Sequence, residues 1–277
     1  MATGIDHVVI AVNDLDQATA DFTEAGFTVT PGGEHANGET HNALIAFADG
    51  SYFEIIAWKD PASASANTWL RRLQAGEGFV DYALRVADLD AEVERLRAAG
   101  IDAPEPVAGG RTRPDGERVE WMNLRFDHEK HPSLPFYCHS TNDRNLRVPS
   151  GNAAIHANLV TGIDAIFIGV NDFQQAVRDY AIVSGIELTV DGRSQAPENT
   201  REEFRIGTVS VVLIKPGDGD SDISKSVATR GEVPVEVVLR STAEQGSSVD
   251  PGLSHGAKLA IMGRQVEAGI HDGSLSQ

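Results

Sequence analysis

The sequence predicts an α+β fold in which a βαβββ module is repeated in tandem and the last copy is degenerate. Three stretches share an apolar strand, a capping aspartate, an amphipathic helix and a terminating glycine. The capping and terminating residues lie 12, 12 and 13 residues apart: Asp14 and Gly26, Asp88 and Gly100, Asp172 and Gly185. Short β-like runs separated by turn residues follow each helix, so the stretches share one architecture.

The first module begins with an apolar strand at residues 5–12. Asp14 is the expected N-cap of the helix that follows, and Gly26 is its expected end. Apolar residues recur along this helix at helical spacing, namely Leu15, Ala18, Phe22 and Ala25. Three further strands are expected at residues 27–30, 42–47 and 52–58.

The later modules repeat this order with increasing departures. The expected strands are 79–86, 119–126 and 134–139 in the second module, and 163–170, 204–206 and 209–214 in the third. A fourth module has strands at 233–239 and 256–262, with a Ser/Gly-rich stretch in place of its helix. Polar segments at 140–158 and 216–231 are predicted to be the linkers between the second and third modules and between the third and fourth modules. We therefore expect a domain at residues 1–140, a linker at 141–160 and a second domain at 161–277.

Composition limits the class of partner. A formal charge of −18 and a pI near 4.8 disfavour nucleic acid and anionic membrane surfaces. The single cysteine excludes an internal disulfide framework, and no apolar stretch reaches the roughly 18 residues that span a bilayer. The start of the chain lacks the pattern of a secretory leader. We expect a cytoplasmic protein that binds a small molecule. The sequence allows a monomer or a homodimer.

Two polar residues stand inside apolar strands of the first module. His7 opens one strand and Glu54 lies within another, where a buried lone carboxylate costs several kcal/mol unless it is compensated. Strand alternation turns both away from the face that packs on the helix. Imidazole and carboxylate together suit a divalent metal such as Zn, Mn, Fe, Ni or Co. The alternatives are a histidine bonded to backbone and a carboxylate held by an arginine or by amides.

Four segments of the first module carry a resemblance to a known family: Asp6-His-Val-Val-Ile-Ala-Val12, Pro31-Gly-Gly-Glu-His35, Thr40-His-Asn42 and Gly50-Ser-Tyr-Phe-Glu-Ile-Ile-Ala-Trp58. With the repeated βαβββ module, they resemble the glyoxalase-like domain group of the vicinal oxygen chelate superfamily. That superfamily includes glyoxalase I, the bleomycin- and fosfomycin-resistance proteins and the extradiol dioxygenases. The resemblance implies that two modules pair, that their sheets curl into an open barrel, and that first and fourth strands donate metal ligands. It is strong over residues 4–140 and weaker beyond residue 158.

The remaining ligands depart from the family pattern. Aligning the second module on the first places Asp81 opposite His7, where the superfamily more often has His or Gln. The last strand of the second module has no Glu, and one register sets Tyr137 against Glu54 and His139 towards the cavity. Asp81 and His139 are therefore the further ligand candidates. A turn acceptor and a strand end at the surface are the respective alternatives.

Other residues are candidates for contact with substrate. We expect His156 to lie at the mouth of the pocket, and His41 and Asn42 to lie beside it unless they only form a turn. Arg125, with Arg111 and Arg113, either selects an anionic substrate or is a solvated charge. Cys138 is expected to be buried in the core and to face away from the cavity.

These residues suggest a metal-dependent lyase or isomerase that acts on a small oxygenated molecule. The metal would polarise a carbonyl while Glu54, Tyr137 or His41 moves the proton. A metal-free, drug-sequestering binding protein is the alternative. An extradiol-type dioxygenase is the third choice, because Ala165 replaces the histidine of the third module and residues 209–214 contain no acid.

Overall fold

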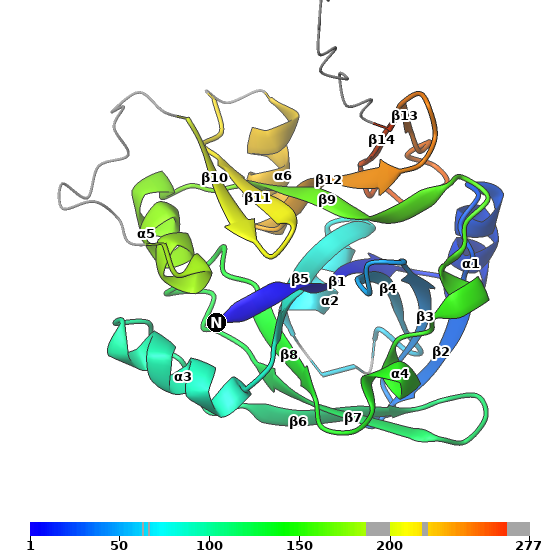
Figure 1. Ribbon diagram of the computed structural model, residues 1–277, viewed down its shortest axis with the longest axis horizontal. Coiled ribbons are helices and arrows are strands. Elements are labelled where there is room, and N and C mark those ends of the chain that lie inside the picture. Colours follow the sequence, from blue (N-terminus) through cyan, green and yellow to red (C-terminus); the bar gives the residue numbers. More distant parts are fainter. Residues whose placement is uncertain (63, 66, 187–199, 218–220, 265–277) are drawn as a thin grey trace, which may run out of the picture.

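The computed structural model describes the chain except residues 63, 66, 187–199, 218–220 and 265–277. Fourteen strands form two sheets, a closed eight-stranded barrel and a six-stranded open sheet (Figure 1). The α+β class is confirmed. No helix in the described part of the chain combines the length and apolarity needed to cross a bilayer.

Two βαβββ modules build the barrel. The first contains β1 (Ala2–Val12), α1 (Leu15–Glu24), β2 (Thr30–His35), β3 (Thr40–Ala46) and β4 (Tyr52–Trp58). After α2 (Thr68–Gln74), the second contains β5 (Gly78–Val86), α3 (Leu89–Ala98), β6 (Val107–Thr112), β7 (Arg118–Leu124) and β8 (Phe136–Ser140). The barrel order is β1-β4-β3-β2-β6-β7-β8-β5.

The second sheet comes from the rest of the chain. After α4 (Arg144–Arg147) and the 3-10 turn η1 (Gly151–Ala154), the elements are β9 (Val160–Gly169), α5 (Phe173–Ser184), β10 (Arg201–Ile206), β11 (Val209–Ile214), α6 (Asp222–Arg230), β12 (Pro234–Ser241), β13 (Ser247–Ser248) and β14 (Leu259–Met262). The sheet order is β10-β11-β9-β12-β14-β13.

The predicted helix caps are present. The side chain of Asp14 accepts hydrogen bonds from the amides of Asp16 and Gln17 at the start of α1. Asp88 caps α3 and Asp172 caps α5 in the same way. Gly185 ends α5 in the left-handed region at φ 71°, where a residue without Cβ is favoured. Local capping chemistry therefore sets where these helices begin and end.

The barrel is closed, whereas the family resemblance implies an open one. Closure occurs where β2 pairs with β6, with Glu34 opposite Thr112 and His35 opposite Arg111. On the other side, β1 pairs with β5 over most of its length. The sequence pattern does not reveal β6, because Ala108, Gly109 and Gly110 give it little β propensity.

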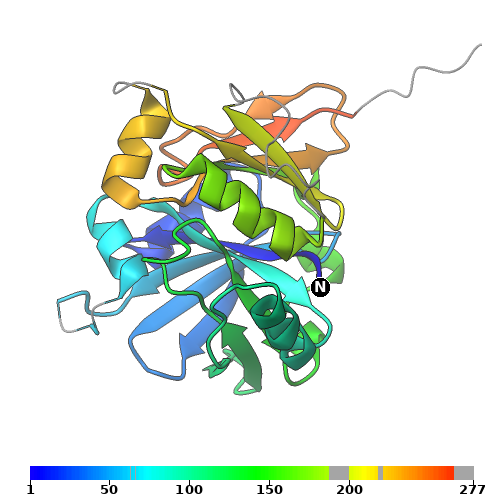
Figure 2. The same cartoon turned by 90° about the vertical axis from the view of Figure 1, so that its left-hand side faces the viewer.

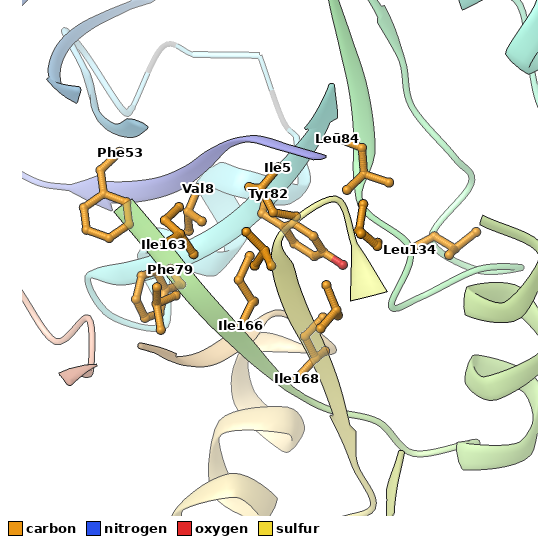
Figure 3. Close-up of a cluster of buried hydrophobic side chains, with 14 of the residues drawn as sticks. Ile5, Val8, Phe53, Phe79, Tyr82, Leu84, Leu134, Ile163, Ile166 and Ile168 are labelled. Atoms are coloured by element: carbon orange, nitrogen blue, oxygen red, sulfur yellow. The ribbon is translucent and has the colours of Figure 1, made fainter. Parts of the chain in front are cut away.

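The second sheet covers the outer face of β1 and β5, as Figure 2 shows from the side. Ile163, Ile166 and Ile168 of β9 pack against Val8 and Phe79 of the barrel in one continuous core (Figure 3). The hydroxyl of Tyr82 lies 2.5 Å from that of Tyr180 on α5. These contacts leave the inner face of the barrel free for a site.

Two helices lie where the sequence predicts none. Residues 216–231 read as a joint, yet α6 lies there, with Ser221 capping it and Val227 buried beneath it. Helix α2 precedes β5 in the same way that α6 precedes β12. Both helices are short and polar, and burial of a few side chains stabilises them more than their intrinsic propensity does.

Candidate functional site

A cavity of about 530 Å³ lies inside the barrel. Its polar wall comes from the first module and includes His7, His35, Asn42 and Glu54. Its aromatic and cationic wall comes mostly from α2 and the second module and includes Trp69, Trp121, Arg125 and Phe136. Volume and lining are those of a small-molecule site.

His7 is fixed by contacts on three sides. Its Nδ1 lies 2.8 Å from Oδ1 of Asp6, and its ring stacks on Tyr52 with the centroids 4.7 Å apart. Phe136 meets the same ring edge-on at 5.3 Å. Because Asp6 accepts the Nδ1 proton, Nε2 directs a lone pair into the cavity.

Glu54 is the centre of the polar wall. One carboxylate oxygen accepts a 2.7 Å hydrogen bond from Nδ2 of Asn42 and lies 3.3 Å from Nε2 of His35. The other oxygen lies 3.5 Å from Nε2 of His7. Burial raises the pKa of Glu54, but the hydrogen bond and charge of His35, the charge of His7 and the bond from Asn42 together lower it from 4.5 to about 2. The carboxylate is therefore ionised.

Asp6 stands behind His7 in a buried ion pair. Its two oxygens lie 2.7 and 2.9 Å from Nη1 and Nη2 of Arg147, a bidentate arrangement. Nη1 of Arg147 also donates to the hydroxyl of Tyr52 at 2.6 Å. Although burial raises the pKa of Asp6, the charge of Arg147 and the bonds from His7 and Arg147 hold it well below its ordinary value. Asp6 therefore stays a carboxylate that orients His7.

His35 is a residue of the site that sequence reasoning missed. Its Nδ1 lies 2.8 Å from the hydroxyl of Thr40, and this contact aims Nε2 at Glu54. The pairing of β2 with β3 shifts register between Pro31 and Gly33, and Gly33 has φ 126°. Such a bulge changes which side chains face the cavity. The Gly-Gly pair before His35 was the signal in the sequence.

Tyr137 and His139 lie outside the cavity, so the register expected for this strand was wrong by one residue. In β8 the side chains that line the cavity are those of Phe136 and Cys138. Tyr137 packs on the helix side, where its hydroxyl donates to Glu92 at 2.9 Å. Nδ1 of His139 lies 3.1 Å from the carbonyl of Val86. The parallel pairing of β8 with β5 fixes this register, and a shift of one residue exchanges the two faces.

Two further candidates also point away from the cavity. In β3, His41 pairs with Ala57, whereas Asn42 pairs with Ile56 and shares its inner face. His41 is therefore on the outer side. His156 was expected at the mouth, but its Nδ1 accepts from the amide of Thr28 at 3.0 Å and its Nε2 bonds the carbonyl of Ala46. Burial lowers the pKa of His156, which holds the loop before β9 as a neutral side chain.

Asp81 is buried but does not line the cavity. It accepts a 2.8 Å hydrogen bond from Nε1 of Trp69 and another from the amide of Tyr82. Nη1 of Arg125 is 3.9 Å from it. The carboxylate therefore supports the aromatic and cationic wall from behind, instead of facing His7 as the alignment of the modules suggested.

Of the three arginines, Arg111 and Arg125 line the cavity, whereas Arg113 pairs with Asp115 on the surface at 2.7 Å. Arg111 donates to the backbone carbonyls of Gly32 and Arg147. Cys138 is buried as expected, but its side chain lines the cavity. Burial raises the pKa of this thiol to about 12, so it stays protonated.

The donor set for a metal is only partly the expected one. In the described residues, the group of ligand-type side chains whose atoms all lie within 4.8 Å is Asp6, His7 and Cys138. That group does not suit an ion, because Arg147 occupies Asp6 and the thiol is protonated. His7 and Glu54 fit better, since a carboxylate that fixes the remote nitrogen is the usual support of a metal-bound histidine. His35 is the third donor beside Glu54.

The second sheet has no counterpart of this polar wall at the corresponding positions. Ala165 takes the place of His7, and β11 is apolar except for Ser210. His255 lies instead between Asp21 and Glu77, at 3.0 and 2.8 Å, where it joins the two sheets. The site is therefore confined to the barrel.

Two βαβββ modules paired in one barrel, with a histidine on the first strand facing a glutamate on the fourth, agree with the vicinal oxygen chelate superfamily. Within it, the chain belongs to the family of the glyoxalase-like domain, whose sequence model matches residues 5–183. No curated protein matches the chain.

Several solved structures are similar to this chain at low sequence identity. A hypothetical protein from Staphylococcus aureus is 14% identical with a TM-score of 0.71, and the match covers 94% of this chain and 99% of that one. A xylose isomerase-like TIM barrel/4-hydroxyphenylpyruvate dioxygenase fusion protein is 12% identical with a TM-score of 0.56, covering 99% of this chain and 51% of that one. Methylmalonyl-CoA epimerase from Mycobacterium tuberculosis is 24% identical over 50% of this chain and 87% of its own, with a TM-score of 0.36.

Proposed function

We propose that this protein is a metal-dependent lyase or isomerase that acts on a small oxygenated molecule inside the barrel. The observation that carries the proposal is the approach of Nε2 of His7 to Oε2 of Glu54 at 3.5 Å. When His7 is neutral and its Nδ1–H is bonded to Asp6, the lone pair of Nε2 faces the carboxylate of Glu54. Two such groups repel each other unless a proton or a cation lies between them.

His7 and Glu54 would hold the ion, while Nε2 of His35, which is near enough to be a third donor, stays directed at Oε1 of Glu54 for proton transfer. A bound divalent metal acts as a Lewis acid that polarises a substrate carbonyl and stabilises developing negative charge on oxygen. Asp6 keeps His7 in the tautomer that leaves Nε2 free, and Arg147 keeps Asp6 ionised. Stacking on Tyr52 fixes the plane of the His7 ring.

The proton carriers of the proposal are Glu54 and His35. Of the three carriers that the sequence suggested, Glu54 is the one that lines the cavity, since Tyr137 and His41 point outward. Thr40 holds His35 with Nε2 3.3 Å from Oε1 of Glu54, so a proton can pass between these atoms. Trp58, Phe136 and Ile56 give the cavity an apolar lining near these groups.

Metal binding tests the proposal directly. Isothermal titration of the chelator-treated protein with Zn²⁺ and Mn²⁺ should give one site per chain, and bound metal should raise the midpoint of thermal unfolding. His7→Ala and Glu54→Gln should each weaken binding by at least about a hundredfold. The matched control is His41→Gln, which removes an outward imidazole and should bind metal as the wild type does.

A metal-free binding protein is the second candidate. The aromatic wall favours it, because Trp58, Trp69, Trp121 and Phe136 together offer an apolar surface for a flat ligand. If the wild type takes up no divalent ion and gains no thermal stability from any, the enzyme proposal fails and this candidate replaces it. Equal loss of metal in His41→Gln and His7→Ala would also reject the assigned ligands.

A further inference from the structure

Alternate residues at the end of β7 present three different side chains to the cavity. Trp121, Asn123 and Arg125 all line it, whereas the intervening Leu124 is buried in the core outside the barrel. The alternation of a strand therefore continues for one residue past Leu124, where β7 ends. An indole, an amide and a guanidinium stand in a row on the wall formed by the second module.

Arg125 is held by rings and not by hydrogen bonds. Its guanidinium carbon lies 4.4 Å from the ring centroid of Trp69 and 4.2 Å from that of Phe136. The nearest carboxylate is Asp81 at 3.9 Å, and in the described part of the chain no acceptor lies within hydrogen-bond distance of this guanidinium. Stacking uses the faces of the planar group and leaves its N–H edges available to an acceptor in the same plane.

Asn123 supplies a second polar group without a partner. Its Oδ1 is buried and has no hydrogen-bond partner among the described residues, although such an atom normally has one. The two orientations of a side-chain amide have the same shape, so either its oxygen or its NH₂ group can meet a ligand. A cavity wall with a guanidinium that makes no hydrogen bond among the described residues, beside an amide oxygen without a partner, suits a polar group that comes from outside the chain.

A solvated surface arginine is the alternative reading, and the structure argues against it. The Arg125 side chain is 43% exposed at the edge of the cavity, but its guanidinium packs against two aromatic rings, which a freely solvated group would not do. Arg111, which lines the same cavity, donates its hydrogen bonds to backbone carbonyls. Among the described residues it has no carboxylate within ion-pair distance. With Arg147 balanced by Asp6, the cavity lining carries Arg111 and Arg125 against Glu39 and Glu54, whereas the whole chain carries −18.

We propose that Asn123 and Arg125 form a subsite for a carboxylate, so that the substrate is a small acid with a flat apolar body. The aromatic rings of Trp69, Trp121 and Phe136 would contact that body. A carboxylate matches the N–H edge of arginine in bidentate geometry. Placing the reacting oxygens of this acid at His7 and Glu54 rests on the proposed function; the subsite itself does not.

The test compares acids with neutral amides of the same shape. Binding of phenylacetate, phenylacetamide, benzoate and benzamide is measured by titration calorimetry on the full chain at low salt. The wild type should bind each acid at least about tenfold more tightly than its amide, as expected for a charge-assisted pair. Arg125→Gln should bring the acid-to-amide ratio close to one. Arg97→Gln, which removes an exposed guanidinium from α3 and changes the net charge equally, should keep the ratio.

Three results would overturn the subsite: equal affinity of the wild type for acid and amide, no binding of any of the four probes at millimolar concentration, or an unchanged ratio in Arg125→Gln. Titration of Arg125→Gln with Mn²⁺ separates the two proposals. If the wild type binds no metal and still prefers acids through Arg125, the enzyme proposal fails and the subsite stands. If metal binds normally and the preference is absent, only the subsite is rejected.

Discussion

Nε2 of His7 lies 3.5 Å from Oε2 of Glu54, although the two residues belong to the first and last strands of the first module. The parallel pairing of β1 with β4 sets Tyr52 opposite His7 and Val9 opposite Glu54, so the two side chains are diagonal neighbours on one face. A hydrogen bond from Asn42 then holds Glu54, and a hydrogen bond from Nδ1 of His7 to Asp6 holds His7. Strand register thus creates the polar centre of the cavity.

The stability of the protein should depend on the ionisation of Glu54. Its pKa is about 2 in the folded protein against 4.5 ordinarily, so the carboxylate stabilises the fold above pH 4.5 and loses this contribution as the pH falls towards 2. At neutral pH the contribution is about 3 kcal/mol. The difference in unfolding free energy between wild type and Glu54→Gln should fall by half near about pH 3. Urea unfolding in the presence of chelator measures it, and a difference that is constant with pH would contradict the prediction.

Removing Arg147 should destabilise the fold strongly. The side chains of Asp6 and Arg147 are 0% and 3% exposed, so Arg147→Met leaves a buried carboxylate without its main partner. We expect a loss of about 3 to 5 kcal/mol in unfolding free energy, and partial recovery in the double variant with Asp6→Asn. Arg144→Gln is the control, because Arg144 touches Asp6 at 3.1 Å from a more exposed position and should cost less. Equal losses from Arg144→Gln and Arg147→Met would refute this account.

The thiol of Cys138 should be inert in the folded protein. It lines the cavity, but its pKa of about 12 leaves almost no thiolate at mildly alkaline pH. A chromogenic disulfide reagent should therefore react with Cys138 only after denaturation. Rapid reaction of the native protein, at a rate like that of the denatured chain, would show that the thiol is not shielded as described.

The hydroxyl of Tyr180 should contribute more to the unfolding free energy than the hydroxyl of Tyr82. Tyr180 donates to the carbonyl of Ser133 at 2.7 Å and also meets Tyr82, whereas Tyr82 has only the second contact. Tyr180→Phe leaves the buried carbonyl of Ser133 without its donor and should lower the unfolding free energy by about 1 to 3 kcal/mol. Tyr82→Phe should lower it less. Chemical unfolding followed by circular dichroism provides the comparison. A larger loss from Tyr82→Phe would reverse the assignment of the donor.

Much of the barrel follows from the sequence because its strands are bounded by turn residues. The pattern delimits β4 and β11 to the residue, since each is a run with a single polar interruption between turns. His7 and Glu54 stand out because a polar residue in such a run is costly. Capping aspartates likewise mark α1, α3 and α5.

The rest of the site depends on register, which composition does not encode. Residues 134–139 carry apolar side chains on both faces of the strand, so periodicity does not tell whether Tyr137 points into the cavity or away from it. The pairing of this strand with β5 determines which face is inward. A bulge at Gly33 brings His35 to Glu54. His156 was expected at the mouth of the pocket, but tertiary hydrogen bonds at both ring nitrogens hold it in a buried position. Long-range contacts of this kind have no local signal.

The two modules of the barrel pair along two junctions of different length, and this difference bears on how the cavity can open. Pairing of β1 with β5 is long and is covered by the second sheet, whereas pairing of β2 with β6 is confined to Glu34 and His35. We therefore expect amide hydrogens at the junction of β2 with β6 to exchange with solvent sooner than those between β1 and β5. Because His35 belongs to that short junction, opening the barrel there would move its imidazole away from Glu54 and would couple ligand entry to the polar centre.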